Sequence, residues 1–211
     1  MGGRLDAVLL DVDDTLVQTA RTGHAKCVEV ARRLGLQPPS AAEFAAVYGR
    51  EPWPACARTW HPGLDDLDGY VALYDGLAAR FPDRPCGDAP RLVARCRRLG
   101  LRVGVLTNGP ERKTARKLRA AGLAPDALDG VWSREHLPHS KPDPRCFAPA
   151  LAAWGLPPGR VRYVADAPGD WAAATAAGLQ FRAVLTGLTG RAAWSCLLRG
   201  RCIVERLDDA V

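Results

Sequence analysis

Two aspartates near the N-terminus stand where a carboxylate could do chemistry. Asp11 and Asp13 close the apolar run Leu5–Val12, whose length and β-branched members predict a buried strand of a parallel sheet. In an extended chain, residues two apart share a face, so the two side chains would point the same way. One carboxylate could attack a phosphate ester while its neighbour donates a proton to the leaving oxygen. Taken alone, the pair could equally be turn or helix-cap acids.

Further polar side chains follow later apolar runs of the chain. They supply a hydroxyl, an amide, an amine and two carboxylates: Thr107, Asn108, Lys141, Asp166 and Asp170. In an open parallel sheet, ligands bind beyond the carboxyl ends of the strands, so we expect these groups to meet the N-terminal aspartates. A site that transfers an anionic phosphoryl group must gather positive charge and fixed hydrogen-bond donors around it.

The rest of the chain supplies the elements that would position these groups. Apolar runs alternate with helical patterns that end at a glycine, which predicts right-handed β-α-β units and an α/β fold with a Rossmann-like parallel sheet. The expected strands are 5–12, 101–106, 127–132, 161–165 and 181–185, and the expected helices are 88–99, 111–121, 144–154 and 170–177.

The stretch from residue 17 to residue 86 breaks this alternation. It lacks a convincing strand and carries helix-like segments at 21–34, 41–48 and 64–80. We interpret it as a helical cap subdomain, 17–86, inserted into an α/β core of 1–16 and 87–211. Its candidate ligand contacts are Arg21, His24, Arg50, Trp53, Trp60 and His61. Arg21 and His24 lie three apart and share a helix face, although each candidate alone is more often surface charge or packing.

Four motifs, taken in order, resemble those of a known family. DVDDT (Asp11–Thr15), VLTNG (Val105–Gly109), SKPDP (Ser140–Pro144) and ADAPGD (Ala165–Asp170) are similar to the motifs of the haloacid dehalogenase-like hydrolase superfamily. The helical insertion resembles the type 1 cap of its phosphatase branch. The resemblance covers nearly the whole chain, apart from the insertion and the last 25 or so residues, and it implies hydrolysis of a small phosphorylated metabolite.

The resemblance also implies a role for each motif residue. Asp11 would be the nucleophile that forms an aspartyl-phosphate, and Asp13 the general acid and base. Thr107 and the Asn108 backbone N–H would hold phosphate oxygens, together with Lys141, which would also pair with the nucleophile. Arg21 and His24 would contact the substrate from the cap. The implied cofactor is Mg²⁺, held by Asp11, the Asp13 backbone carbonyl and Asp166, with Asp170 either binding the ion directly or holding one of its waters.

Some residues separate the activities known in this superfamily. Asp13 favours phosphoryl chemistry over dehalogenation, because a halide leaving group needs no proton. A sugar-phosphate mutase uses the same residues and stays open, since only exclusion of water by the cap separates the two activities. Ala165 and Gly169 depart from the family pattern, which leaves open a non-catalytic member that binds a phosphorylated ligand. Asp170 could also be the N-cap of the following helix, and Asp14 stands where glycine is commonest.

Composition excludes several other classes of protein. The 211 residues are 47% hydrophobic and 25% charged, typical of a folded protein and unlike a disordered or collagen-like chain. No apolar run approaches the roughly 20 residues that a membrane helix needs, and no secretory signal is visible, so we expect a cytoplasmic protein without membrane contact. The net charge of +6 is spread along the chain, and we expect no nucleic-acid partner. The seven cysteines form no Cys-x-x-Cys pair and predict no disulfide or zinc site. We expect a monomer or homodimer.

Overall fold

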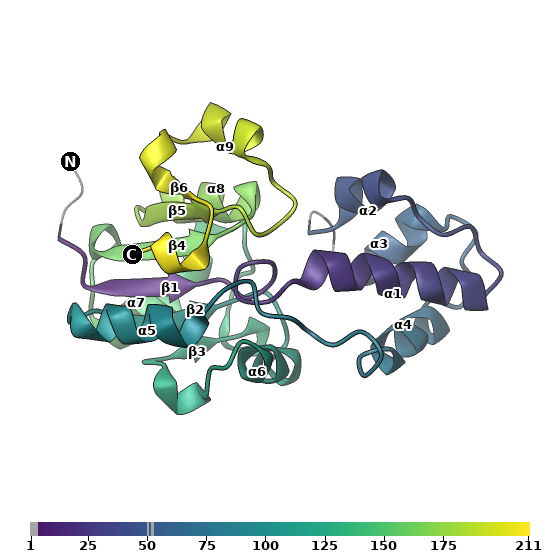
Figure 1. Ribbon diagram of the computed structural model, residues 1–211, viewed down its shortest axis with the longest axis horizontal. Coiled ribbons are helices and arrows are strands. Elements are labelled where there is room, and N and C mark those ends of the chain that lie inside the picture. The colour runs from purple at the N-terminus through teal and green to yellow at the C-terminus, as the bar shows by residue number, and fades with distance from the viewer. Residues whose placement is uncertain (1–3, 50, 52) are drawn as a thin grey trace. The chain divides into compact units, whose positions relative to one another are not determined.

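The computed structural model describes residues 4–49, 51 and 53–211 (Figure 1). The chain divides into two compact units, which we call the core unit (Met1–Gln18 and Arg84–Val211) and the helical unit (Thr19–Asp83). The predicted insertion, 17–86, extends two residues further at its start and three residues further at its end.

A parallel sheet of six strands forms the centre of the core unit, in the order β3-β2-β1-β4-β5-β6 (Figure 1). This order confirms the predicted α/β class. The strands are β1 (Ala7–Leu10), β2 (Arg102–Leu106), β3 (Val131–Trp132), β4 (Val161–Ala165), β5 (Gln180–Val184) and β6 (Ile203–Val204). The sequence did not predict β6, because two residues at a sheet edge are too few to show a period.

Both faces of the sheet are covered by helices, as the continuous apolar strands predicted. Val8 and Leu10 pack with α5 (Ala89–Arg98) and α6 (Glu111–Ala120) on one face. Ala7 and Leu9 pack on the other face, which is covered by α7 (Ala148–Trp154) and α8 (Pro168–Ala176). Trp194 of α9 (Arg191–Leu197) is buried against β5 and β6. Every residue of β1 is therefore buried, which fixes the strand that leads into the candidate site.

Two predicted helices of the core unit differ from the structure by more than one residue at one end. The segment 144–154 is a 3-10 turn, η3 (Pro144–Phe147), followed by α7. Pro149 has no N–H to donate to the carbonyl four residues earlier, so one α-helix cannot run unbroken through the segment. The segment 170–177 begins two residues earlier, at Pro168, and its N-cap is Ala167. Asp170 is therefore not the N-cap. It lies in the first turn, where a carboxylate also favours the positive end of the helix dipole.

The helical unit contains α1 (Thr19–Arg33), α2 (Ala41–Val47), α3 (Trp53–Trp60) and α4 (Leu67–Gly76). Helix α3 was not predicted, since Pro54 suggested a break. Proline is tolerated in the first turn of a helix, and Pro54 lies there. Helix α4 covers only the middle of the predicted segment 64–80.

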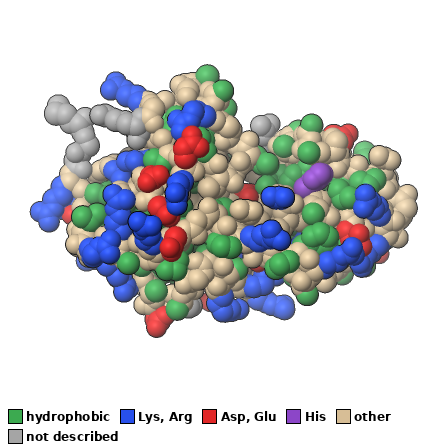
Figure 2. Space-filling view, viewed as in Figure 1, with side chains coloured by type: hydrophobic (Ala, Val, Ile, Leu, Met, Phe, Trp, Pro, Cys, Tyr) green, Lys and Arg blue, Asp and Glu red, His purple; other side chains and the backbone are tan. Residues whose placement is uncertain are grey.

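The molecular surface and the cysteines agree with a folded protein that lacks disulfides. Lys and Arg side chains are interspersed with Asp and Glu on the face that Figure 2 shows. All seven cysteines are free thiols. Within the described residues, no helix is both long enough and apolar enough to cross a membrane.

Candidate active site

The carboxyl ends of β1, β2 and β4 bring most of the predicted residues to one edge of the sheet. The register pairs Leu10 with Val105 of β2 and with Val164 of β4. Asp11 continues this ladder, because its N–H donates to the Val164 carbonyl oxygen at 3.0 Å. The nucleophile candidate therefore sits on fixed backbone, and only 6% of its side chain is exposed.

Lys141 reaches into this edge from its loop and joins two carboxylates. Its ammonium lies 2.7 Å from Asp11 Oδ1 and 2.8 Å from Asp170 Oδ1. It also donates to the Tyr163 hydroxyl oxygen at 2.7 Å, and the tyrosine O–H in turn donates to the Leu106 carbonyl at 3.0 Å. An ammonium has three donors, and these three acceptors satisfy it while only 8% of the side chain is exposed. The sequence did not predict Tyr163; its one signal was a hydroxyl in a buried strand, on a ring that is itself fully buried.

Asn108 holds the Lys141 backbone in place from the end of β2. Its Nδ2 donates to the Lys141 carbonyl and its Oδ1 accepts from the Lys141 N–H, both at 2.9 Å. This two-point contact ties the lysine loop to the strand end. Thr107 is buried, and its Oγ1 accepts from the Gly109 N–H at 3.1 Å, which leaves its hydroxyl hydrogen available to a ligand.

Asp166 completes an acidic cluster at the end of β4. Carboxylate oxygens of Asp11, Asp166 and Asp170 all lie within 4.8 Å of one another, a spacing that can hold a cation. Thr15 donates to Asp166 Oδ1 at 3.3 Å. Gly187 lies so close that a Cβ there would come within 1.8 Å of Asp166 Oδ2, so only glycine leaves room for this carboxylate.

The backbone conformation of Asp14 explains why glycine is commonest at this position in the family. Its φ is +54°, in the left-handed region that side chains other than glycine rarely adopt. The Thr186 hydroxyl donates to the Asp14 carbonyl at 2.5 Å and fixes this turn. The turn redirects the chain immediately after Asp13.

The electrostatics of the cluster follow from burial and from the crowding of carboxylates. Burial raises the pKa of Asp11 to about 7; Lys141 opposes the rise, while Asp170 and Asp13 add to it. Burial, together with Asp14 and Asp11, raises the pKa of Asp166 well above its usual range. Burial lowers the pKa of Lys141, but Asp11 and Asp170 outweigh it, and the net change is upward. Lys141 is therefore cationic, in a site that holds three neighbouring carboxylates.

Asp13 meets a cation that the sequence analysis did not assign to the site. Its carboxylate Oδ1 accepts a hydrogen bond from the ammonium of Lys117, on α6. The dense basic residues of Arg112–Arg119 indicate the solvent face of one helix, and for Lys117 that interpretation is wrong. The available signal was spacing: Lys117 follows the buried Thr114 by three residues and precedes the buried Leu118, so it borders the inward helix face.

The predicted cap residues lie in the helical unit. Arg21 is exposed, whereas His24 Nε2 lies 2.9 Å from the Pro39 carbonyl oxygen, with its ring 5.2 Å from that of Phe44. Three further candidates have packing contacts inside the unit. Trp53 packs on Tyr74, Trp60 stacks on Phe44, and the buried His61 lies beside Tyr70. Arg50 lies outside the described residues.

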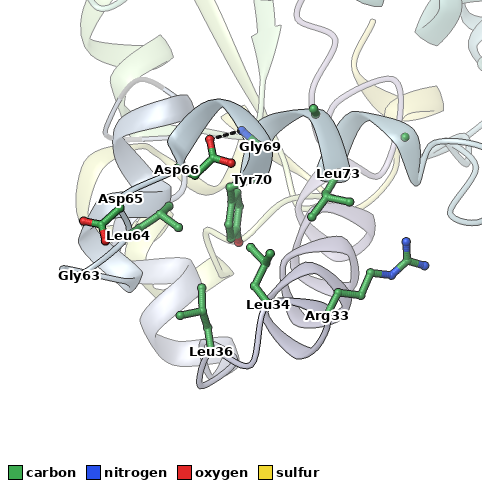
Figure 3. Close-up of a pocket in the computed structure, with 12 residues that line it drawn as sticks. Arg33, Leu34, Leu36, Gly63, Leu64, Asp65, Asp66, Gly69, Tyr70 and Leu73 are labelled. Atoms are coloured by element: carbon green, nitrogen blue, oxygen red, sulfur yellow. Dashed lines mark hydrogen bonds between the residues drawn. The ribbon is translucent and has the colours of Figure 1, made fainter.

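A groove of about 690 Å³ lies wholly within the helical unit and contains none of the predicted site residues (Figure 3). Leu34, Leu36, Leu64 and Leu73 surround Tyr70 there. Two aspartates also line it, and Asp66 accepts from the Gly69 N–H at 2.8 Å. Arg33 lines the groove as well, but none of the motif residues does, so the strand-end cluster remains the better candidate.

The fold and this cluster define a strand-end site of an α/β protein, in which a buried carboxylate lies beside an ammonium. A family model described as haloacid dehalogenase-like hydrolase matches residues 5–178. The chain belongs to this family, which confirms the resemblance of the four motifs, and it is an enzyme of the hydrolase class.

Named relatives agree with this assignment, and solved structures share the fold. The chain is 30% identical over 185 residues to a phosphoglycolate phosphatase of Cereibacter sphaeroides, covering 84% of each chain. It is 29% identical over 205 residues to a phosphoserine phosphatase of Thermus thermophilus, covering 76% of this chain and 80% of the relative. A Bacteroides fragilis structure assigned to the same hydrolases has a TM-score of 0.82 at 21% identity, covering 99% and 100%. A Thermotoga maritima structure assigned as a β-phosphoglucomutase has a TM-score of 0.77 at 18% identity, covering 98% and 96%.

Proposed function

We propose that this chain is a Mg²⁺-dependent phosphatase that hydrolyses a small phosphorylated metabolite through an aspartyl-phosphate on Asp11. The observation that supports this most strongly is the buried contact of Lys141 with both Asp11 and Asp170. A carboxylate that must attack an anionic ester needs a neighbouring cation, and Lys141 can exchange one of its three present acceptors for an incoming phosphate oxygen while it stays beside the nucleophile. The named phosphatase relatives support the same activity.

The residues present fit a magnesium ion. Three carboxylate oxygens within 4.8 Å of one another suit a small cation that takes oxygen ligands at about 2.1 Å. The raised pKa values of Asp11 and Asp166 express an excess of buried negative charge that a dication would relieve. Asp11, Asp166 and Asp170, with the Asp13 backbone carbonyl, would hold the ion. When bound, it would offset the repulsion between the nucleophile and the phosphate.

In the first step, Asp11 attacks phosphorus while Thr107, Asn108 and Lys141 hold the phosphate oxygens. The bond between phosphorus and the ester oxygen breaks as the bond to the Asp11 carboxylate oxygen forms. Asp13 donates its proton to the departing oxygen, so that the product leaves as an alcohol. Lys141 stays bound to the carboxylate whose charge is being shared with phosphorus.

In the second step, water attacks the phosphorus of the aspartyl-phosphate. Asp13, now a carboxylate, takes a proton from that water, and the bond from phosphorus to Asp11 breaks. Inorganic phosphate is released and both aspartates return to their starting states. Asp11 is thus the nucleophile in the first step and the leaving group in the second, while Asp13 is first the general acid and then the general base. The two pairs of roles require two separate aspartates.

The test is Mg²⁺-dependent release of phosphate from an aryl phosphate by the wild-type chain and by Asp11→Asn. We expect the variant to lose activity, because an amide oxygen cannot form the phosphoenzyme. An active variant would exclude the proposed nucleophile. A mutase would use the same residues, and the mutase structure shares the fold. Isomerisation of a sugar phosphate with little phosphate release would favour that alternative, whereas binding without turnover would favour a non-catalytic member.

A further inference from the structure

Tyr163 differs from the other two hydrogen-bond acceptors of Lys141 in charge and in burial. Its hydroxyl oxygen lies 2.7 Å from the Lys141 ammonium and carries no charge, whereas the other two acceptors are carboxylates of Asp11 and Asp170. The tyrosine is fully buried, while 6% of the Asp11 side chain and 8% of the Asp170 side chain are exposed. One of the three ammonium donors is therefore directed into the protein core, and the other two are directed to groups at the edge of the site.

The core unit holds the Tyr163 hydroxyl in a fixed place. Tyr163 belongs to β4, and its ring packs edge-on against that of Phe147, with 4.9 Å between the ring centroids. Its O–H donates to the Leu106 carbonyl oxygen, at the end of β2, at 3.0 Å. Close packing around the ring and this hydrogen bond prevent the hydroxyl from following a moving lysine. The lysine must instead come to the tyrosine.

Lys141 itself lies in a loop, between the 3-10 turns η2 (Arg134–His136) and η3. The Asn108 side chain holds the Lys141 backbone through two hydrogen bonds of 2.9 Å. Beyond the backbone, however, a lysine ammonium is carried on a flexible four-carbon stem. The contact with Asn108 therefore fixes where the side chain starts, and only contacts at the ammonium fix where it ends.

An incoming phosphate oxygen has to replace one of the three acceptors of Lys141. In the proposed mechanism, Lys141 stays bound to Asp11 during the attack. A phosphate oxygen cannot take the place of the Tyr163 hydroxyl without displacing a buried residue of β4. The contact with Asp170 is therefore the one that a phosphate oxygen replaces, and the contact with Tyr163 is kept before and after the ligand binds.

We propose that Tyr163 is a positioning residue that holds the Lys141 ammonium in place while its contact with Asp170 is exchanged for a phosphate oxygen. This inference rests on the proposed phosphatase function and deepens it. Without the hydroxyl, the ammonium is held by its two carboxylates alone and moves toward them. The donor that is freed is directed into the core, so it cannot bind the ligand instead. A donor that is already in position stabilises a phosphate oxygen better than one that must first be moved.

The test is Tyr163→Phe, which keeps the packed ring and removes only the hydroxyl. The first readout is the dissociation constant of inorganic phosphate, measured by titration calorimetry with Mg²⁺ present. The second is kcat/KM for an aryl phosphate. A hydrogen bond that involves a charged group is strong enough for us to expect about tenfold weaker phosphate binding and about tenfold lower kcat/KM. Loss of folded protein alone would lower the number of binding sites in the titration but leave the dissociation constant unchanged.

Two further variants isolate the contact with Lys141. Tyr70→Phe is the matched control, because Tyr70 is likewise fully buried but belongs to the helical unit, and it should change both readouts by less than about twofold. The Tyr163 hydroxyl also lies close to the Asp11 carboxylate, so a direct effect on the nucleophile is the alternative explanation. If Tyr163 acts through Lys141, adding Tyr163→Phe to Lys141→Met should lower the remaining kcat/KM by less than about twofold.

The outcomes separate this inference from the proposed function. If Tyr163→Phe binds phosphate and turns over the aryl phosphate as the wild type does, the positioning role is overturned while the phosphatase function stands. A tenfold loss that persists in the Lys141→Met background overturns it too, because the hydroxyl then acts on Asp11 directly. If the wild type with Mg²⁺ neither hydrolyses the aryl phosphate nor binds inorganic phosphate, the proposed function itself fails, and this inference fails with it.

Discussion

Replacing Lys141 by methionine should destabilise the core unit strongly, and more so at alkaline than at acidic pH. Lys141→Met preserves an unbranched chain but leaves Asp11 and Asp170 without their common cation. It also removes a donor to the Tyr163 hydroxyl. Removing one partner of a buried ion pair costs about 3–5 kcal/mol, because the remaining charge stays buried without compensation. We therefore expect a loss of about 3–5 kcal/mol in the free energy of unfolding near pH 8 without metal.

The same loss should shrink on acidification. Burial already raises the pKa of Asp11 to about 7, and Lys141 opposes that rise. Without the lysine, the pKa rises further, so near pH 5 Asp11 is protonated and no longer a buried charge. We expect the destabilisation near pH 5 to fall to about 1–2 kcal/mol. With Mg²⁺ present, Lys141→Met should lower kcat by about 100- to 1,000-fold, as for other preorganised electrostatic groups.

The assay is urea unfolding in EDTA, followed by tryptophan fluorescence at both pH values. Four of the six tryptophans, at 132, 154, 171 and 194, belong to the core unit. Arg145→Met is the matched control, because Arg145 pairs with Asp143 at 2.6 Å in the following turn but is 67% exposed. An exposed pair is worth less than about 1 kcal/mol, so the control should change little at either pH. A loss for Lys141→Met below about 1 kcal/mol near pH 8, or an equal loss at both pH values, would refute this reasoning.

Two further predictions concern the acidic cluster. The raised pKa of Asp11, about 7 against an ordinary 3.8, means that metal-free stability present at low pH is lost as the pH rises through 7. Asp11→Asn cannot titrate at this position. Its free energy of unfolding, relative to that of the wild type, should therefore rise by at least about 1 kcal/mol from about pH 4.5 to pH 8. If urea unfolding shows the same difference at both pH values, the raised pKa of Asp11 is not the cause. Gly187→Ala places a Cβ within 1.8 Å of Asp166 Oδ2 and should raise the Mg²⁺ concentration for half-maximal activity about tenfold or more. The control is Gly190→Ala, since a Cβ there meets nothing within 4 Å, and equal metal dependence of the two variants would argue against a metal role for Asp166.

Much of the core could be predicted because its signals are local. A buried parallel strand must be apolar throughout, and a helix that stops at glycine leaves its mark in consecutive residues. Glycines 100, 122, 155 and 178, which ended the predicted helices, all have positive φ. Shorter elements escaped for the same reason, since β6 has only two residues and α3 begins beside a proline.

The residues of the candidate site also fall into two groups, those that local sequence motifs predicted and those that they did not. Asp11, Lys141 and Asp170 were predicted together from motifs at the strand ends, and the structure brings them into contact. Lys117 and Gly187 were not, because their importance comes from contacts across long stretches of chain. Lys117 is 104 residues from Asp13 in sequence, and no pattern within α6 says which acid it meets. Gly187 has an ordinary φ, so only the close approach of Asp166 makes glycine necessary there.

This division explains why the motifs identify the groups that take part in the chemistry but not the residues that contact those groups from elsewhere. A motif records groups that must touch the reacting phosphate, and these lie at strand ends in nearly fixed register. A group that acts through another residue only has to reach that residue, and any neighbouring helix can supply it. In this chain the helix is α6. It follows β2, which lies beside β1 in the sheet, and its Lys117 contacts Asp13 in the turn after β1.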